Sequence, residues 1–117
     1  MIYIGTDIVD VNRIRQIINK KKERFLKKIF TDNEIKYCQL KIDSPIHFSG
    51  RFAAKEAVKK ALLSSGFSKK ISMKKIEVLS SENGPKVNIY SSDKIINLSI
   101  SHTKNHAIAT AILEKIV

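Results

Sequence analysis

Acidic and basic side chains gather between Arg51 and Ala61 in an arrangement that is unusual for a solvated helix. At about 100° per residue, Lys55 and Lys59 fall on one exposed stripe. Glu56 and Lys60 fall on the arc that carries the apolar residues of the segment. We therefore expect an acid and a base to face inward, where they need a counter-charge, a metal ion or a ligand. An i,i+4 ion pair between Glu56 and Lys60 is the structural alternative.

A third charged residue, Asp7, lies inside a predicted strand. Aliphatic residues alternate from Ile2 to Val9, which places Asp7 on the face opposite Ile4. Strand interiors disfavour Asp, although an Asp can also serve a local turn. Mg²⁺ takes one or two protein carboxylates and completes its shell with water and phosphate oxygens. Asp7 and Glu56 are therefore the candidate metal ligands, provided that the strand packs on the helix.

The segment from Ser101 to Thr103 ends a predicted strand at a turn, where hydroxyl, imidazole and exposed backbone donors could hold a phosphate. Adjacent strand positions point to opposite faces, so Ser101 and His102 do not form a nucleophile and base pair. We interpret this segment as a phosphate-binding candidate. The other two histidines, His47 and His106, have no partner that the sequence identifies.

Helices must occupy the middle of the chain. Asp10 is placed to cap a basic helix with one apolar side, formed by Val11, Ile14, Ile17 and Ile18. Thr31 and Glu34 form a capping box for a short helix through Leu40. The Ala-rich segment from about His47 to Ser64 favours a longer helix.

Strands follow these helices. Ile76, Val78 and Ser80 alternate before the turn Glu82-Asn83-Gly84-Pro85, and Val87, Ile89 and Ser91 alternate after it. The segments 97–102 and 106–113 repeat the pattern around a polar turn at 103–105. We therefore expect an α+β fold and a single domain over residues 1–117.

The charge of the chain indicates an anionic partner. Twenty-two Lys and Arg oppose eleven Asp and Glu, which gives a net charge of +11. A small nucleic-acid-binding domain is the alternative function from another class. The three Tyr and five Phe form no base-stacking series interleaved with basic residues, which argues against nucleic acid.

Cysteine content and hydropathy bear on location. Cys38 is the only cysteine, which excludes an internal disulfide or a Cys-based zinc cluster and fits a reducing compartment. The first residues lack the cationic leader of a secretory signal, and no apolar run is long enough to span a bilayer. We expect a cytoplasmic protein without membrane insertion.

Three motifs together resemble those of the holo-acyl-carrier-protein synthases: Ile4-Gly5-Thr6-Asp7-Ile8, Arg51-Phe52-Ala53-Ala54-Lys55-Glu56-Ala57 and Ser99-Ile100-Ser101-His102-Thr103. The resemblance implies the 4′-phosphopantetheinyl transferase fold, an antiparallel sheet packed on a long central helix plus short helices. It also implies a homotrimer with active sites between neighbouring chains. The implied reaction transfers phosphopantetheine from coenzyme A to a serine of an acyl carrier protein and releases adenosine 3′,5′-bisphosphate. Transferases of broad specificity, which resemble two such units in one chain, are a related possibility.

The resemblance also implies roles for individual residues. Asp7 and Glu56 would bind Mg²⁺ with the pyrophosphate of coenzyme A, and Glu56, directly or through a metal-bound water, would help to remove the serine proton. Lys60 would stabilise or protonate the departing phosphate. The remaining positions expected to contact coenzyme A, some at its 3′-phosphate and adenosine end, are Arg51, Gly84, Pro85, Ser101, His102 and Thr103.

The basic first helix would bind the acidic acyl carrier protein. The residues expected to do so are Arg13, Arg15, Arg24 and Lys28. This chain also departs from the family pattern: Leu62 and Leu63 follow Ala61 where relatives have Gly-Thr-Gly, Gly84 and Pro85 are adjacent without the usual intervening Lys, and the segment 41–50 lacks an arginine often found there.

Overall fold

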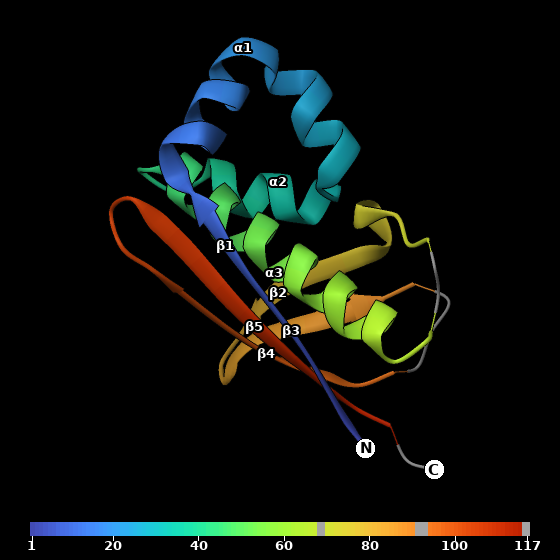
Figure 1. Cartoon of the computed structure of the whole chain (residues 1–117). Helices are drawn as coiled ribbons and strands as arrows, with labels where there is room; N and C mark the ends of the chain where they lie inside the picture. Colours follow the sequence, from blue (N-terminus) through green and yellow to red (C-terminus); the bar gives the residue numbers. More distant parts are fainter. Residues whose placement is uncertain (68–69, 91–93, 116–117) are drawn as a thin grey trace.

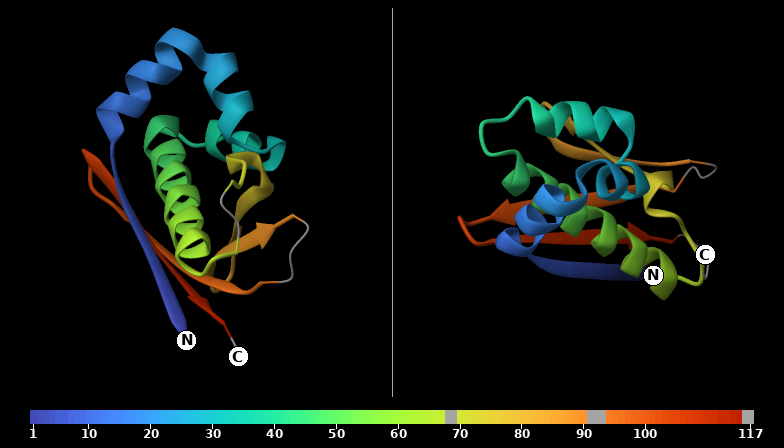
Figure 2. Two further views of the ribbon diagram at one scale, coloured as in Figure 1. Left: turned by 45° about the vertical axis from the view of Figure 1, so that its right-hand side comes forward. Right: turned by 90° about the horizontal axis from the view of Figure 1, so that it is seen from above.

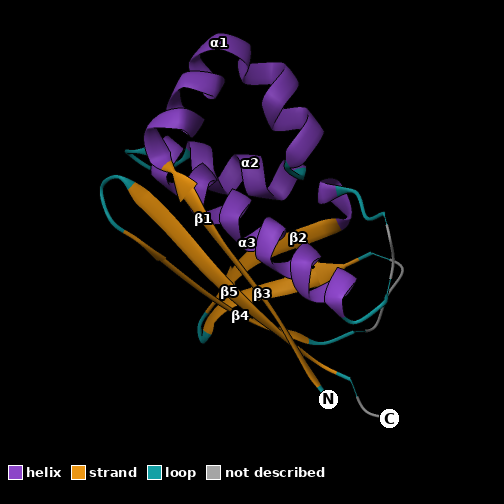
Figure 3. Cartoon of the chain, in the orientation of Figure 1, coloured by secondary structure: helices purple, strands orange, loops and turns teal. Residues whose placement is uncertain are grey.

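The computed structural model describes residues 1–67, 70–90 and 94–115. Along the chain, the elements are β1 (Ile2–Asp10), α1 (Val11–Ile29), α2 (Asp32–Gln39), α3 (Ser44–Ser64), the 3-10 helix η1 (Met73–Lys75), β2 (Ile76–Ser81), β3 (Gly84–Ile89), β4 (Ile96–His102) and β5 (His106–Glu114) (Figure 1). Helices occupy the middle of the chain and antiparallel strands its ends, which confirms the predicted α+β class (Figure 3).

The strands form two sheets. β1, β5 and β4 make an antiparallel three-stranded sheet in that order, whereas β2 and β3 make a separate hairpin. α3 packs against all three strands of the larger sheet and also contacts α1, α2 and β2 (Figure 2). The central helix therefore has a different neighbour on each side, and each side can position a different group of side chains.

The predicted helix signals are present in the structure. The Asp10 side chain caps α1 by accepting from the backbone N–H of Asn12 at 2.9 Å, and Thr31 and Glu34 form the predicted capping box of α2. α1 departs from helical geometry at Lys21 and bends over α3 (Figure 1). α3 begins at Ser44, earlier than predicted, because Pro45 is tolerated in the first helical turn.

Both predicted hairpins are confirmed. β2 pairs with β3 through the turn at Glu82-Asn83, directly before Gly84, and β4 pairs with β5 through the turn at 103–105. Gly84 has a φ of +108°, a conformation that favours glycine in such a turn. Ser91, predicted to continue the alternation of β3, lies outside the described residues.

On the face of the three-stranded sheet that points away from α3, β1 and β5 expose aliphatic side chains. Gly5 and Val9 are buried toward α3, while β1 and β5 expose large aliphatic side chains on the opposite face. These side chains are 39–65% exposed and comprise Ile2, Ile4, Ile8, Ile108 and Ile112. The aliphatic side of β1 therefore points outward, and Asp7 shares the inner side with Gly5.

No helix within 1–67, 70–90 and 94–115 combines the length and hydropathy needed to cross a membrane.

Candidate active site

Close packing of β1 on α3 brings Asp7 to the central helix. A Cβ atom on Gly5 would lie 1.9 Å from the carbonyl oxygen of Ala57 and 2.7 Å from the backbone nitrogen of Ala61, so only glycine permits this approach. Asp7 follows Gly5 on the same face of the strand and reaches the helix near Lys60. The expectation that the strand packs on the helix is confirmed.

Lys60 and Glu56 do not occupy equivalent positions. Lys60 Nζ donates to Asp7 Oδ1 at 3.1 Å and to the Thr6 carbonyl oxygen at 3.0 Å. The prediction that Lys60 faces inward is wrong, because half of its side chain (52%) is exposed at the edge of β1. Glu56 is partly buried and has no ion-pair or hydrogen-bond partner among the described residues, so the alternative Glu56–Lys60 pair does not form.

Lys55 is the buried lysine of α3. It was expected on an exposed stripe with Lys59, but it is fully buried and donates to Glu34 Oε1 at 2.5 Å. The expectation failed because α2 covers this side of α3 and supplies the counter-charge. Burial lowers the pKa of Lys55, whereas the Glu34 carboxylate raises it.

Asp7 and Glu56 line one pocket of about 490 Å³ between β1, α1 and α3. Its walls also include Asp10 at the start of α1 and the aromatic rings of Phe25 and Phe52, whose centroids are 6.1 Å apart. We call this the carboxylate pocket. No cluster of three or more Asp, Glu, His or Cys that could hold a metal was found within the described part of the chain. Two carboxylates nevertheless fit Mg²⁺, which takes its remaining ligands from water and phosphate.

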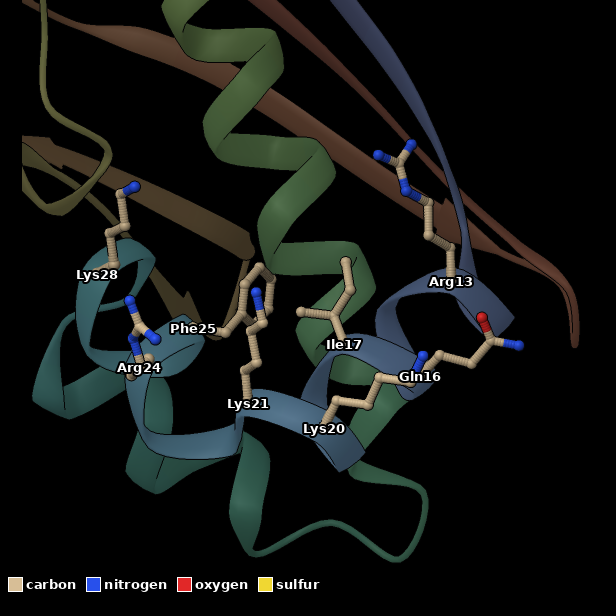
Figure 4. A pocket seen from close by; sticks show the side chains of 8 residues that line it. All are labelled: Arg13, Gln16, Ile17, Lys20, Lys21, Arg24, Phe25 and Lys28. Carbon is tan, nitrogen blue, oxygen red and sulfur yellow. The ribbon is translucent and has the colours of Figure 1, made fainter.

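A basic groove runs along α1 next to the carboxylate pocket (Figure 4). It encloses about 580 Å³ and is lined by Arg13, Gln16, Ile17, Lys20, Lys21, Arg24, Phe25 and Lys28. Three of the four predicted carrier contacts therefore lie together. Arg15 does not, because it pairs with Asp43 at 3.2 Å and lines another surface. Lys20 and Lys21 join the groove without having been predicted to do so.

Arg51 lies on another side of α3, in a pocket of about 350 Å³. Its Nη2 donates to Ser80 Oγ at 2.8 Å, and its guanidinium lies 4.5 Å from the centre of the Tyr37 ring. The buried Nε has no hydrogen-bond partner among the described residues. Hydrogen bonding to Ser80 and the nearby Arg51 charge lower the pKa of Tyr37. A buried guanidinium with a donor to spare is suited to an anion. We call Tyr37, Arg51 and Ser80 the arginine pocket.

The predicted phosphate turn is partly occupied by its own hydrogen bonds. The Thr103 N–H donates to the His106 carbonyl oxygen at 2.8 Å, and the Thr103 hydroxyl accepts from the N–H groups of Asn105 and His106. The backbone N–H groups of Thr103, Asn105 and His106 are therefore already paired, and within the predicted segment 101–103 this applies to Thr103. Ser101 and His102 lie on opposite faces of β4, as predicted, and only His102 shares the face that covers α3.

Gly84 and Pro85 are at the tip of the β2–β3 hairpin. Pro85 lines a surface pocket between β3 and β4 that shares no residue with the carboxylate or arginine pockets. Pro85 is nevertheless the cross-strand partner of Ser80, whose hydroxyl accepts from Arg51, so the tip of the hairpin adjoins the arginine pocket.

Sequence reasoning missed residues that became site members only through folding. His106 lines the carboxylate pocket, and Tyr37 and Ser80 hold Arg51 from α2 and β2. The ring of His47 lies 6.3 Å from that of His102. In the sequence, only the spacing of His47 one helical turn before Arg51 could have indicated that His47 and Arg51 lie close together.

Cys38 is excluded as a nucleophile. It is buried, and this burial raises the pKa of its thiol to about 12.

Comparisons with known proteins are consistent with this geometry. The pattern of the 4′-phosphopantetheinyl transferase superfamily matches residues 3–111. The chain is 46% identical to a holo-[acyl-carrier-protein] synthase of Chlamydia pneumoniae over 96% of both chains. A Bacillus anthracis holo-(acyl-carrier-protein) synthase, solved in complex with CoA (3′,5′-ADP), is 37% identical with a TM-score of 0.80, covering 97% of this chain and 96% of that one. A Helicobacter pylori counterpart in complex with coenzyme A is 30% identical with a TM-score of 0.82, covering 95% and 99%.

Proposed function

Because the chain belongs to the 4′-phosphopantetheinyl transferase superfamily and, within it, to the holo-[acyl-carrier-protein] synthases, we propose that it uses Mg²⁺ to transfer 4′-phosphopantetheine from coenzyme A to a carrier serine. The second product is adenosine 3′,5′-bisphosphate. The Bacillus anthracis relative, which was solved with CoA (3′,5′-ADP), supports this product.

The observation that carries the proposal is that the basic groove and the carboxylate pocket are continuous. Arg13, Ile17 and Phe25 line both. An acidic carrier protein that binds along α1 can therefore present its serine next to Asp7 and Glu56. The basic residues would attract the carrier through charge, and the shared apolar walls would exclude water from its attachment point.

Asp7 and Glu56 are the proposed Mg²⁺ ligands. Both carboxylates line the same pocket, and Glu56 has no competing partner among the described residues. The ion, when bound, neutralises charge on the pyrophosphate of coenzyme A. Asp7 would have to exchange its contact with Lys60 for the ion, which an exposed ion pair permits at small cost.

Glu56 is proposed to accept the serine proton, and Lys60 is proposed to stabilise or protonate the leaving phosphate. The serine Oγ forms a bond to the β-phosphorus while the bond from that phosphorus to the bridging pyrophosphate oxygen breaks. Glu56 accepts the serine proton on its carboxylate. Lys60 Nζ, on the next turn of α3, stabilises or protonates the phosphate that leaves. The chain contributes mainly position and charge, as expected for phosphoryl transfer.

We propose that one coenzyme A contacts two copies of this chain. Glu56 and Arg51 are about 140° apart around α3, and their pockets share no lining residue. The pyrophosphate and the 3′-phosphate are carried by the same ribose, so one molecule cannot easily reach around a helix about 10 Å wide. A homotrimer assembled through the exposed aliphatic face of β1 and β5 would supply the second copy.

Mass spectrometry of an apo acyl carrier protein tests the proposal. With coenzyme A, Mg²⁺ and this protein, the carrier should gain the mass of phosphopantetheine, and adenosine 3′,5′-bisphosphate should appear in equal amount. Chelation of the metal or the change Glu56→Gln should abolish the gain. Glu23→Gln, at an exposed carboxylate outside both pockets, is the matched control and should remain active. No gain with several carriers would contradict the proposal and would direct attention to nucleic-acid binding.

A further inference from the structure

Arg15 of α1 and Asp43, which directly precedes α3, form an ion pair across 28 residues of sequence. Arg15 Nη1 donates to Asp43 Oδ1 at 3.2 Å, and Nη2 donates to Oδ2 at 3.5 Å. The guanidinium and the carboxylate therefore meet edge to edge through two hydrogen bonds. Such a two-point contact fixes the direction of both side chains as well as their distance.

The carboxylate of Asp43 is used between elements and not within α3. Asp43 occupies the N-cap position of α3, where an Asp usually accepts from a backbone N–H group of the first turn. Among the described residues its side chain makes no such capping bond and turns to Arg15. The turn before it exposes 80% of Leu40 and 107% of Ile42, so packing holds this turn only weakly.

An open pocket of about 620 Å³ lies between α1 and the start of α3 beside the ion pair. Arg15 lines it from α1, and Ser44 and Pro45 line it from α3. On its inner side, the first half of α1 is anchored by Val11 and Ile14, which are buried. Close packing fixes α1 there, whereas toward the pocket the Arg15–Asp43 pair makes a direct link across open space.

The first half of α1 also carries Arg13 and Ile17, which line both the basic groove and the carboxylate pocket (Figure 4). Each is two residues from Arg15 and therefore about 200° away around the helix. A rotation of this half that moves Arg15 must also move Arg13 and Ile17. Because α1 departs from helical geometry at Lys21, its second half does not hold the first half as one straight rod.

We propose that Arg15 is a positioning residue for carrier binding, and that its ion pair with Asp43 orients α1 so that Arg13 and Ile17 face the carrier. The inference rests on the proposed function. It gives Arg15 an indirect role in place of the direct carrier contact expected from the sequence. The two roles differ in what they require of Asp43. A direct contact would compete with Asp43 for the guanidinium, whereas the positioning role needs Asp43.

Steady-state kinetics of the Asp43→Asn variant with an apo acyl carrier protein tests the proposal, because the two roles predict opposite signs. Under the positioning role, the KM for the carrier should rise about threefold, in line with loss of a partly exposed ion pair. The kcat at saturating carrier should change little, since Asp7 and Glu56 are untouched. Physiological ionic strength limits the long-range effect of removing one charge. A KM that is lower or unchanged would overturn the inference.

Exchange of the two charges tests the pair without changing the net charge of the chain. Arg15→Asp and Asp43→Arg should each raise the KM for the carrier, and the double variant should restore it. A double variant as impaired as the worse single variant would overturn the inference. Arg13→Gln is the matched control, because this groove residue should raise the KM whether or not Asp43 is also changed.

The failure of the inference and the failure of the proposed function give different results. If the unchanged protein modified no carrier, the proposed function itself would be contradicted. If it modified the carrier and the exchange did not restore the KM, only the role of Arg15 would be lost. Thermal unfolding identifies an exchanged variant that fails to fold, and the nearly isosteric Asp43→Asn remains decisive in that case.

Discussion

Two lysines of α3 each bond a carboxylate from another element, but in opposite surroundings. Lys55 and Glu34 are both fully buried, whereas Lys60 is 52% and Asp7 19% exposed. Glu34 also accepts from the backbone N–H groups of Thr31 and Val78, so every part of its carboxylate is engaged. Asp7 has only Lys60 among the described residues.

The comparison shows that burial by neighbouring elements, and not the position of the lysine along α3, distinguishes an ion pair that stabilises the fold from one whose partners can react. Removal of one partner from a buried ion pair leaves the other charge uncompensated, so neither partner can leave the pair to bind a ligand. An open pair contributes little to stability, and either partner can turn to a ligand. We therefore expect the Lys55–Glu34 pair to affect folding and the Lys60–Asp7 pair to affect activity.

Asp7→Asn should cause the largest change, a fall in turnover with almost no change in stability. The amide keeps the shape of the side chain but loses the negative charge that holds Mg²⁺ and Lys60. We expect turnover of the carrier to fall about a thousandfold, typical for loss of a preorganised charge, with the free energy of unfolding changed by less than about 1 kcal/mol. Carrier mass spectrometry and urea unfolding measure the two. A large fall in stability would remove the contrast between the pairs.

Glu34→Gln, in contrast, should lower the stability of the fold. It leaves Lys55 buried beside a neutral amide, and we expect a loss of about 3 kcal/mol or more in the free energy of unfolding. Adding Lys55→Met to Glu34→Gln should recover part of this loss, because no unpaired charge remains. Urea unfolding of the single and double variants is the measurement. If Glu34→Gln were as stable as the unchanged chain, the buried pair would have no structural role.

Most of the fold could be predicted because it depends on local signals. Caps at Asp10 and Thr31 and the glycine turn at Gly84 act within a few residues, and the structure contains all three. The side of α3 that meets α2 could not be predicted in the same way. The capping box was recognised at Glu34, but its second partner, Lys55, is 21 residues away. A helical projection gives the angle of each side chain around the helix, but it does not say which element packs on that side.

The same limit applies to the site. Asp7 and Glu56 were predicted to meet, and they line one pocket because Gly5 and Ala57 allow contact between β1 and α3. The surroundings of Arg51 depend on Tyr37 and Ser80, which come from separate elements. Sequence periodicity places side chains on a face, but only tertiary packing decides which faces meet.

Lys60→Met should test the open pair from its other side. Removing the ammonium frees Asp7 and removes the group proposed to stabilise the leaving phosphate. We expect turnover to fall about a hundredfold, less than for Asp7→Asn, because the carboxylates remain in place. The KM for coenzyme A and the unfolding midpoint should change little. A variant that turned over normally would show that Lys60 only neutralises Asp7 in the free protein.

A matched exchange of the two lysines for arginine should give the smallest effects and the most direct comparison. Lys55 has no space around it, so the larger guanidinium of Lys55→Arg must displace packed neighbours, including the Phe30 ring 5.4 Å from its ammonium. Overpacking of this kind costs about 1 to 3 kcal/mol of stability. Lys60→Arg extends into solvent and should change the free energy of unfolding by less than about 0.5 kcal/mol. Thermal unfolding of both variants side by side is the measurement. Equal losses of stability would mean that burial does not distinguish the two ion pairs.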